Sequence, residues 1–294
     1  MSFEKDYGII LKGIGGFYYV LKDQRVYECK AGGRLRLGDM TPVAGDMVTF
    51  ELSGEDGLIT SIKPRKNSLS RPPVANIDRL FIVASAASPK TDPYLIDKVT
   101  VIAVREDIEP VILLNKCDID RCDELYNIYT KAGFATIRVS TVTGEGIDSV
   151  KEMSKNGISC FTGNSGIGKS SIMNCLLPNK NLLVGMISRK VARGKNTTRQ
   201  SELFPCAGGF VIDTPGFSSF DIVKSSSIEK EQLQYCFPEM TGYFDKCRFS
   251  GCAHIKEPGC LVREDVERGF IPKSRYESYV RLYEELSKVK SWER

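Results

Sequence analysis

The chain has 294 residues, of which 41% are hydrophobic, and a formal net charge of +4. That is enough apolar material for two or three hydrophobic cores, and no apolar run approaches the ~20 residues that a membrane-spanning helix needs. The charge is too small to indicate a nucleic-acid partner by itself, and the first residues lack the charged-then-apolar order of a signal peptide, so we expect a cytoplasmic protein without a membrane partner.

Residues 1–70 predict a small β-barrel of the OB type. Short alternating runs at 8–21, 26–29, 46–52 and 57–62 are separated by Gly-rich turns, with no convincing helix. Basic and aromatic side chains in this segment could bind RNA by charge and base stacking, or the aromatic residues could simply fill the barrel. The residues concerned are Lys30, Arg34, Arg36, Lys63, Arg65, Lys66 and Arg71 with Phe17, Tyr18, Tyr19 and Tyr27.

Residues 71–224 alternate between strand and helix patterns and predict an α/β nucleotide-binding domain. It starts with an apolar strand at 79–85. A second apolar run, 109–114, leads directly into Asn-Lys-Cys-Asp at 115–118, and ligands bind beyond the carboxyl ends of such strands. Asp118 can accept hydrogen bonds from guanine N1–H and N2–H, which adenine cannot supply in that arrangement. We expect guanine contacts from Asn115, Lys116 and Asp118.

A polar loop at 140–144 follows the next strand pattern, 137–139. It is similar to the loop that contacts guanine O6 in GTPases, so Ser140 and Thr141 are candidate GTP-binding residues. A plain polar loop without a ligand remains the alternative.

A P-loop occupies residues 163–170, with the sequence Gly-Asn-Ser-Gly-Ile-Gly-Lys-Ser. It lies between a buried strand pattern at 158–161 and the start of a helix, which is the context that the motif requires. Its glycines allow backbone N–H groups to face phosphate at a helix N-terminus. Lys169 supplies charge to the β- and γ-phosphates and is a candidate catalytic residue. The predicted GTP-binding residues are Gly163, Asn164, Ser165, Gly166, Ile167, Gly168, Lys169, Ser170 and Ser171, with Ser170 also a Mg²⁺ ligand.

The polar, basic segment 188–199 is interpreted as switch I, although a solvated loop would look similar. Thr197 and Thr198 could each bind the γ-phosphate and Mg²⁺. The sequence does not choose between them, and Thr198 is our candidate for both the catalytic and the Mg²⁺-binding role.

The strand pattern 209–212 leads into Asp-Thr-Pro-Gly. Asp213 is a candidate Mg²⁺ ligand, and Gly216 can donate its N–H to the γ-phosphate in catalysis. The next residue is Phe217, where Ras-like enzymes carry the glutamine that orients water. The motif order is therefore Asn-Lys-x-Asp, P-loop and Asp-x-Pro-Gly, whereas an ordinary GTPase places the P-loop first, so this chain is interpreted as a circularly permuted GTPase.

Residues 225–294 predict a helical module with a zinc site. Cys247, Cys252, His254 and Cys260 supply three thiolates and one imidazole, and His254 is the only histidine of the chain. Four protein ligands leave no open position, so we expect one structural Zn²⁺ per chain. Reduced cysteines beside a surface histidine are the alternative. The other seven cysteines lack such spacing and are expected to be small core residues in a reducing compartment.

With these features, the chain resembles the bacterial small ribosomal subunit biogenesis GTPases of the RsgA (YjeQ) type. The resemblance covers the barrel, the linker at 71–78, the permuted motif order and the Cys-x4-Cys-x-His-x5-Cys loop. It implies an OB-fold, a permuted GTPase and a zinc module that act in late maturation of the small (30S) subunit. It also implies rRNA binding and a GTPase activity, with Mg²⁺, that the subunit stimulates.

Some members of that family carry a histidine shortly after the Asp-x-Pro-Gly motif, but residues 217–224 contain none. The residue that positions the attacking water is therefore not identified. We expect a monomer that binds GTP and GDP. Two other classes stay open, namely a GTPase with a different target and an RNA-binding assembly factor that senses GTP without hydrolysing it.

Overall fold

The computed structural model describes residues 6–33, 35, 40–53, 56–70, 73–177, 201–213 and 228–288. The chain divides into two compact units, one made of residues 1–80, 149–161 and 170–217 and the other of residues 81–148, 162–169 and 218–294. No helix within the described ranges is long and apolar enough to cross a membrane.

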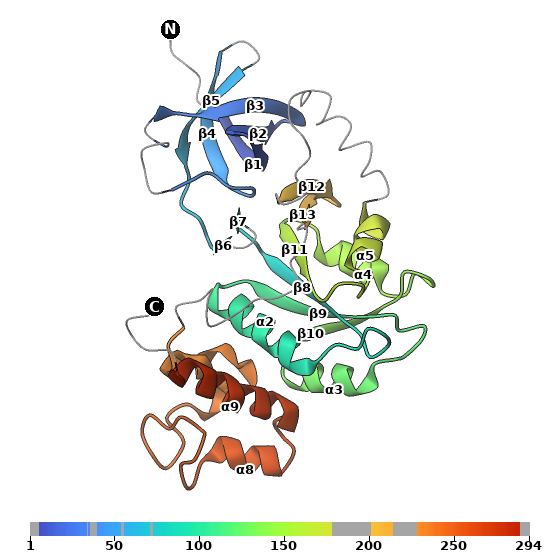
Figure 1. Ribbon diagram of the computed structural model, residues 1–294, viewed down its shortest axis with the longest axis vertical. Coiled ribbons are helices and arrows are strands. Elements are labelled where there is room, and N and C mark those ends of the chain that lie inside the picture. The colour runs from blue at the N-terminus through green and yellow to red at the C-terminus, as the bar shows by residue number, and fades with distance from the viewer. Residues whose placement is uncertain are drawn as a thin grey trace. The chain divides into compact units, whose positions relative to one another are not determined.

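The barrel predicted for the N-terminal segment is present in the first unit (Figure 1). It closes in the order β1-β2-β3-β5-β4, with β3 and β5 parallel and the other neighbouring strands antiparallel. Its strands are β1 (Asp6–Ile14), β2 (Phe17–Lys22), β3 (Arg25–Ala31), β4 (Met47–Ser53) and β5 (Asp56–Ile62).

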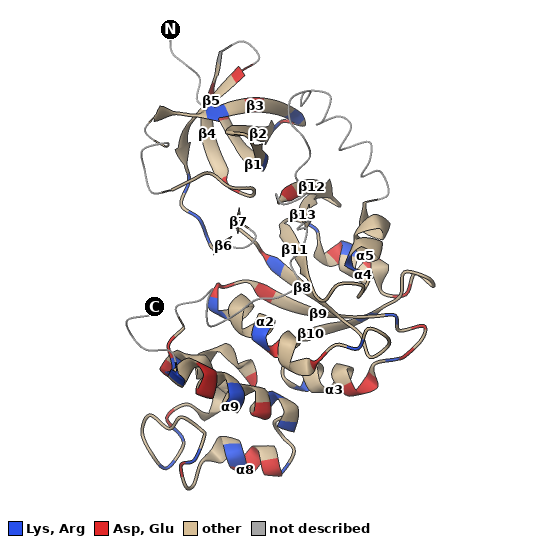
Figure 2. Cartoon of the chain, viewed as in Figure 1, with Lys and Arg blue, Asp and Glu red and all other residues tan. Residues whose placement is uncertain are grey.

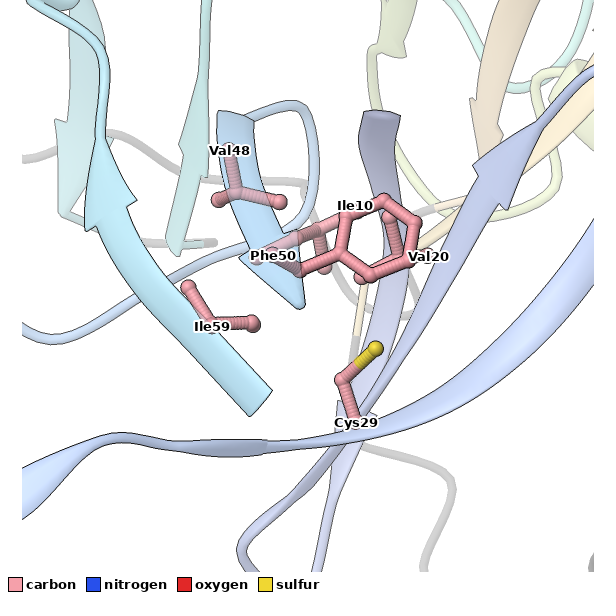
Figure 3. Close-up of a cluster of buried hydrophobic side chains, with 6 residues drawn as sticks. All are labelled: Ile10, Val20, Cys29, Val48, Phe50 and Ile59. Carbon is pink, nitrogen blue, oxygen red and sulfur yellow. The ribbon is translucent and has the colours of Figure 1, made fainter. Parts of the chain in front are cut away.

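Alternate residues of these strands point inward and form the barrel core (Figure 3). The six core side chains, each 0% exposed, are Ile10, Val20, Cys29, Val48, Phe50 and Ile59. Tyr18 and Tyr27 pack against this core, and Tyr19 is 4% exposed. For Tyr18 and Tyr27 the structure therefore shows the core-filling alternative, whereas the Tyr19 ring, next to Val20 in β2, is buried on the other side of that strand.

The basic residues of the barrel have different environments. Arg65 donates to Asp46 at 2.7 and 2.8 Å and to the Thr41 carbonyl at 2.8 Å, so it stabilises a turn. Lys30 is exposed, with its Nζ 5.1 Å from the centre of the Phe17 ring. Arg34, Arg36 and Arg71 lie outside the described residues.

A short ladder of β6 (Ser68–Ser70) and β7 (Pro73–Ala75) leads from the barrel to a six-stranded sheet in the order β10-β9-β8-β11-β13-β12. The strands are β8 (Arg79–Ala84), β9 (Glu109–Asn115), β10 (Ala135–Val139), β11 (Ile158–Thr162), β12 (Glu202–Cys206) and β13 (Gly209–Asp213). The β9–β10 and β11–β13 pairs are parallel, and β12 pairs with β13 antiparallel. All five β11 residues are buried, as expected for a central parallel strand.

Helices α2 (Pro93–Arg105), α3 (Asp123–Lys131), α4 (Ile147–Met153) and α5 (Lys169–Leu176) alternate with these strands. The start of α2 follows from its sequence: Asp92 caps it by accepting from the Tyr94 N–H at 2.9 Å, and proline occupies the first turn.

The C-terminal segment is helical, as predicted, with the 3₁₀ helices η1 (Lys230–Cys236) and η2 (Pro238–Tyr243) and the α-helices α8 (Leu261–Glu267) and α9 (Lys273–Lys288). Charged residues of both signs lie along α9 (Figure 2). Arg275 of this helix is nevertheless 0% exposed. It donates to Asp97 of α2 at 2.7 Å and to Glu239 of η2 at 2.6 Å, so a buried ionic cluster joins these three helices.

Candidate nucleotide-binding site and metal centre

The loop at 163–168 connects β11 to α5 and has the backbone of a phosphate-binding loop. Its three glycines have φ angles of 141° at Gly163, 73° at Gly166 and 102° at Gly168, which side-chain-bearing residues rarely adopt. A Cβ added at Gly168 would also collide with the side-chain nitrogen of Asn115. The strand, loop and helix therefore form the context that favours an anion at the N-terminus of α5.

Lys169, the first residue of α5, folds back over this loop. Its Nζ donates to the carbonyl oxygens of Gly163 at 2.6 Å and Asn164 at 2.9 Å. Burial lowers the pKa of this amine below its usual value. The ammonium group thus lies within the loop whose N–H groups are expected to meet phosphate. Ser170 and Ser171, in the same turn, are exposed.

Asn115 joins the Asn-Lys-x-Asp segment to the P-loop. Its side chain is 2% exposed, and its Nδ2 donates to the Ile167 carbonyl at 2.8 Å. Its Oδ1 is buried and has no hydrogen-bond partner in the described part of the chain. The predicted base-reading and phosphate-binding segments therefore lie next to each other, and the Asn115 side chain connects them by a hydrogen bond.

Lys116 extends this link to a loop that sequence reasoning missed. Its Nζ donates to the carbonyls of Ser88 at 2.6 Å and Gly166 at 3.3 Å. The loop at 85–91 is braced by Thr91 Oγ1, which accepts from the Ser85 N–H at 3.0 Å. Two sequence features could have identified this loop, namely its position directly after the apolar run at 79–84 and its Ser-Pro pair.

Asp118 is exposed, so its carboxylate is accessible to a ligand. Ser140 is 0% exposed, and its Oγ accepts from the N–H groups of Val142 and Thr143, each at 3.2 Å. Its carbonyl accepts from the Gly144 N–H at 2.9 Å. The Ser140 hydroxyl therefore shapes the predicted O6-binding loop, while Thr141 lies half-buried beside it.

Several predicted residues cannot be placed. Thr197, Thr198, Gly216 and the whole of the switch I segment lie outside the described residues. Of Asp213, the structure describes only the backbone, at the end of β13.

The four predicted metal ligands gather into one cluster. The ligand atoms of Cys247, Cys252, His254 and Cys260 all lie within 4.8 Å of one another. His254 Nδ1 lies 3.4 Å from Cys260 Sγ and 3.7 Å from Cys247 Sγ, whereas its Nε2 lies 3.1 Å from the Gln234 side-chain oxygen. The imidazole thus directs Nδ1 to the cluster, and three sulfurs with one nitrogen suit a metal site.

A frame of hydrogen bonds holds the cluster loop, and its members were also missed from the sequence. Glu257 accepts from the N–H groups of Ala253, Ile255 and Lys256 at 2.9–3.0 Å. Burial alone would raise the pKa of Glu257, but its own backbone N–H and these three N–H groups outweigh burial and lower the pKa. From α9, the hydroxyls of Tyr276 and Tyr279 donate to the His254 and Ala253 carbonyls at 2.8 and 2.7 Å.

The remaining cysteines follow the expectation for core residues. Six are buried, namely Cys29, Cys117, Cys122, Cys160, Cys206 and Cys236, and only Cys175 among the seven is exposed.

Comparisons with known proteins agree with this arrangement. Residues 62–223 match the family model described as RsgA GTPase, and residues 7–59 match that of the RsgA N-terminal domain. Proteins named small ribosomal subunit biogenesis GTPase RsgA are similar over nearly the whole chain. One from Caldanaerobacter subterraneus subsp. tengcongensis is 42% identical, with 96% of each chain covered. One from Ruminiclostridium cellulolyticum is 42% identical, with 96% of this chain and 94% of the relative covered.

Two solved structures are similar in fold. YloQ, described as a circularly permuted GTPase, is 32% identical with a TM-score of 0.82, and the match covers 98% of this chain and 96% of YloQ. YjeQ from Thermotoga maritima is 33% identical with a TM-score of 0.83, and the match covers 98% of this chain and all of YjeQ (100%).

Proposed function

The chain belongs to the RsgA family of circularly permuted GTPases, and we propose that it hydrolyses GTP in the late maturation of the small ribosomal subunit. The observation that carries the nucleotide site is the hydrogen bond from Asn115 to Ile167, which joins the guanine-reading segment to the phosphate loop. The names of the relatives, which specify small ribosomal subunit biogenesis, support the choice of target.

In this proposal, the P-loop N–H groups and Lys169 neutralise the phosphates as charge develops on them. Ser170, Thr198 and Asp213 would hold Mg²⁺, which would supply further charge compensation at the phosphate oxygens. Gly216 donates its N–H to the γ-phosphate. Asp118 selects guanine because its carboxylate accepts hydrogen bonds from the N1–H and N2–H groups of the base.

No side chain in the described part of the chain is assigned to the attacking water. Phe217 cannot orient it, and the only histidine is directed to the Cys3His cluster. Positioning accounts for most of the barrier reduction in phosphoryl transfer, so we infer that the small subunit supplies it by ordering this site.

A GTPase assay with and without purified small subunits tests this function. We expect slow turnover by the isolated protein and faster turnover with saturating small subunits, with large subunits as the matched control. Turnover that small subunits leave unchanged would point to another target, and no turnover under either condition would favour a nucleotide sensor.

We also propose that the barrel binds rRNA in the assembled complex. Lys30 supports this because it is exposed and lies beside the Phe17 ring, an arrangement suited to a phosphate next to a base. We further propose that the chain has three domains, at residues 1–70, 71–224 and 225–294. The protein acts in the cytoplasm as a monomer.

Replacing Asp118 with Asn should change base preference. The substitution removes the acceptor that guanine N2–H needs and provides an amide donor for the C2 oxygen of xanthine, so XDP binding should improve relative to GDP binding. The check is a pair of titrations of the variant with GDP and XDP. Asp148→Asn, at an exposed position of α4, is the control. A variant that prefers GDP as strongly as the unmodified chain does would show that Asp118 does not read the base.

We propose that the Cys3His cluster binds one structural Zn²⁺, because four protein ligands leave no position for substrate. Chelation should release the metal and make Cys247, Cys252 and Cys260 reactive. Elemental analysis and thiol labelling of the Cys175→Ser protein measure both changes, since Cys175 is otherwise an exposed background thiol. Cys247→Ser should bind metal weakly from the outset. Equal labelling before and after chelation would contradict the site.

A further inference from the structure

Two base-recognition loops meet at the carboxyl ends of β9 and β10. The segment after β9 carries Asp118, and the loop after β10 begins at Ser140. Guanine presents N2–H, N1–H and O6 along one edge, so a protein that reads all three must keep these loops at a constant separation. Along the backbone, they are joined where the Cys117 N–H donates to the Val139 carbonyl at 3.2 Å.

A side-chain bridge lies farther along both loops. Arg121, which precedes α3, donates from Nη1 to both carboxylate oxygens of Glu145, at 2.9 and 2.8 Å. The carboxylate also affects the base-reading segment itself, because burial and then the neighbouring Glu145 raise the pKa of the Cys117 thiol to about 11. Within its own loop, the Glu145 carbonyl accepts from the Ser140 N–H at 3.0 Å.

Both ends of the bridge have restrained backbones. Arg138 of β10 donates from Nε to the Arg121 carbonyl at 2.7 Å and from Nη2 to Asp123 at 2.6 Å. Its guanidinium group lies 3.8 Å from the centre of the Tyr126 ring. Beside Glu145, Gly146 has a φ of 75° and approaches the Arg138 carbonyl so closely that a Cβ would collide with it.

These backbone restraints affect how much the exposed Arg121–Glu145 ion pair can contribute. The side chains of Arg121 and Glu145 are 52% and 44% exposed, and such pairs usually contribute little, because ordering two long side chains offsets the Coulomb attraction. Here the main chain on both sides is already held, so forming the bridge costs less conformational entropy than an exposed pair usually does. A small displacement of a recognition group weakens binding even when the fold is unchanged.

We propose that Arg121 and Glu145 are positioning residues that hold the two loops at the spacing needed to read the guanine edge. The proposal rests on the guanine site described above. Neither side chain is assigned a contact with the nucleotide. They act through Asp118 and through the loop at 140–144.

The test compares GDP and IDP binding by the full chain, since IDP lacks only the 2-amino group that Asp118 is proposed to read. Glu145→Ala should weaken GDP binding by about two- to fivefold at low salt. The preference for GDP over IDP should fall with it, because the 2-amino contact loses its alignment. Raising the salt concentration should shrink the difference from the unmodified chain, as expected for an exposed ion pair.

A double-mutant cycle isolates the pair. Arg121→Ala combined with Glu145→Ala should cost no more than either change alone, and the exchanged pair Arg121→Glu with Glu145→Arg should recover part of the preference. Glu277→Gln, in the exposed Lys273–Glu277 pair of α9, should leave both affinities unchanged. Thermal melting of each variant checks that the fold is retained.

The outcomes distinguish the positioning role of the Arg121–Glu145 pair from the guanine site on which it rests. A lower GDP-over-IDP preference in Glu145→Ala, together with non-additivity, supports the positioning role. Unchanged GDP affinity, or equal loss of GDP and IDP affinity, overturns it while leaving the guanine site intact. If the unmodified chain does not prefer GDP over ADP, the guanine site fails first, and the role of the pair fails with it.

Discussion

Lys169→Ala will reduce GTP turnover by about a hundredfold or more, with or without small ribosomal subunits, because it removes the P-loop cation that stabilises charge on the transferred phosphoryl group. In the structure, the ammonium group lies within the phosphate-binding loop, where it donates to the carbonyls of Gly163 and Asn164. Phosphate release under single-turnover conditions measures the loss in the chemical step.

The control for this variant is Lys151→Ala, which removes a lysine from an exposed position of α4. Its turnover should match that of the unmodified chain. Because Lys169 also bonds its own loop, thermal melting must show that the Lys169→Ala protein is folded. Turnover within about threefold of the unmodified chain would mean that Lys169 does not stabilise the transition state.

Arg275→Ala will destabilise the second unit by about 3–5 kcal/mol, because it leaves buried carboxylates without their counter-charge. The side chains of Arg275 and Asp97 are 0% exposed, and that of Glu239 is 4% exposed. Burial alone would lower the pKa of Arg275, but the two carboxylates outweigh it and raise the pKa well above its usual value. The guanidinium group also lies 4.5 Å from the centre of the Phe237 ring.

Denaturant titrations, which give the free energy of unfolding of each variant, test this prediction. Arg268→Ala is the matched control, since that side chain is 64% exposed and its loss should cost little. Adding Asp97→Asn and Glu239→Gln to Arg275→Ala should recover part of the loss, because no uncompensated charge then remains buried. A loss below about 1 kcal/mol for Arg275→Ala would show that water or rearrangement compensates the carboxylates.

Features encoded by contiguous residues were predictable. The apolar runs at 79–85, 109–114 and 158–161 are recovered as β8, β9 and β11, because a buried parallel strand consists of one short apolar segment. The barrel strands follow from alternation and Gly-rich turns. The glycine spacing of the P-loop and the Cys3His spacing each specify a local backbone path, and the structure has positive φ angles at these glycines and the expected ligand cluster.

Local patterns along the chain were therefore enough to predict the order of the motifs, the types of element and the candidate groups of each site. The distant residues that support these groups come together only on folding. Asn115 bonds a carbonyl 52 residues away, Gln234 pairs with His254, and Arg275 lies in a core although its helix looks solvent-facing from its charges. A buried charge is tolerated only beside its counter-charge, and Asp97, 178 positions earlier in the chain, becomes a neighbour of Arg275 only when α2 and α9 pack together.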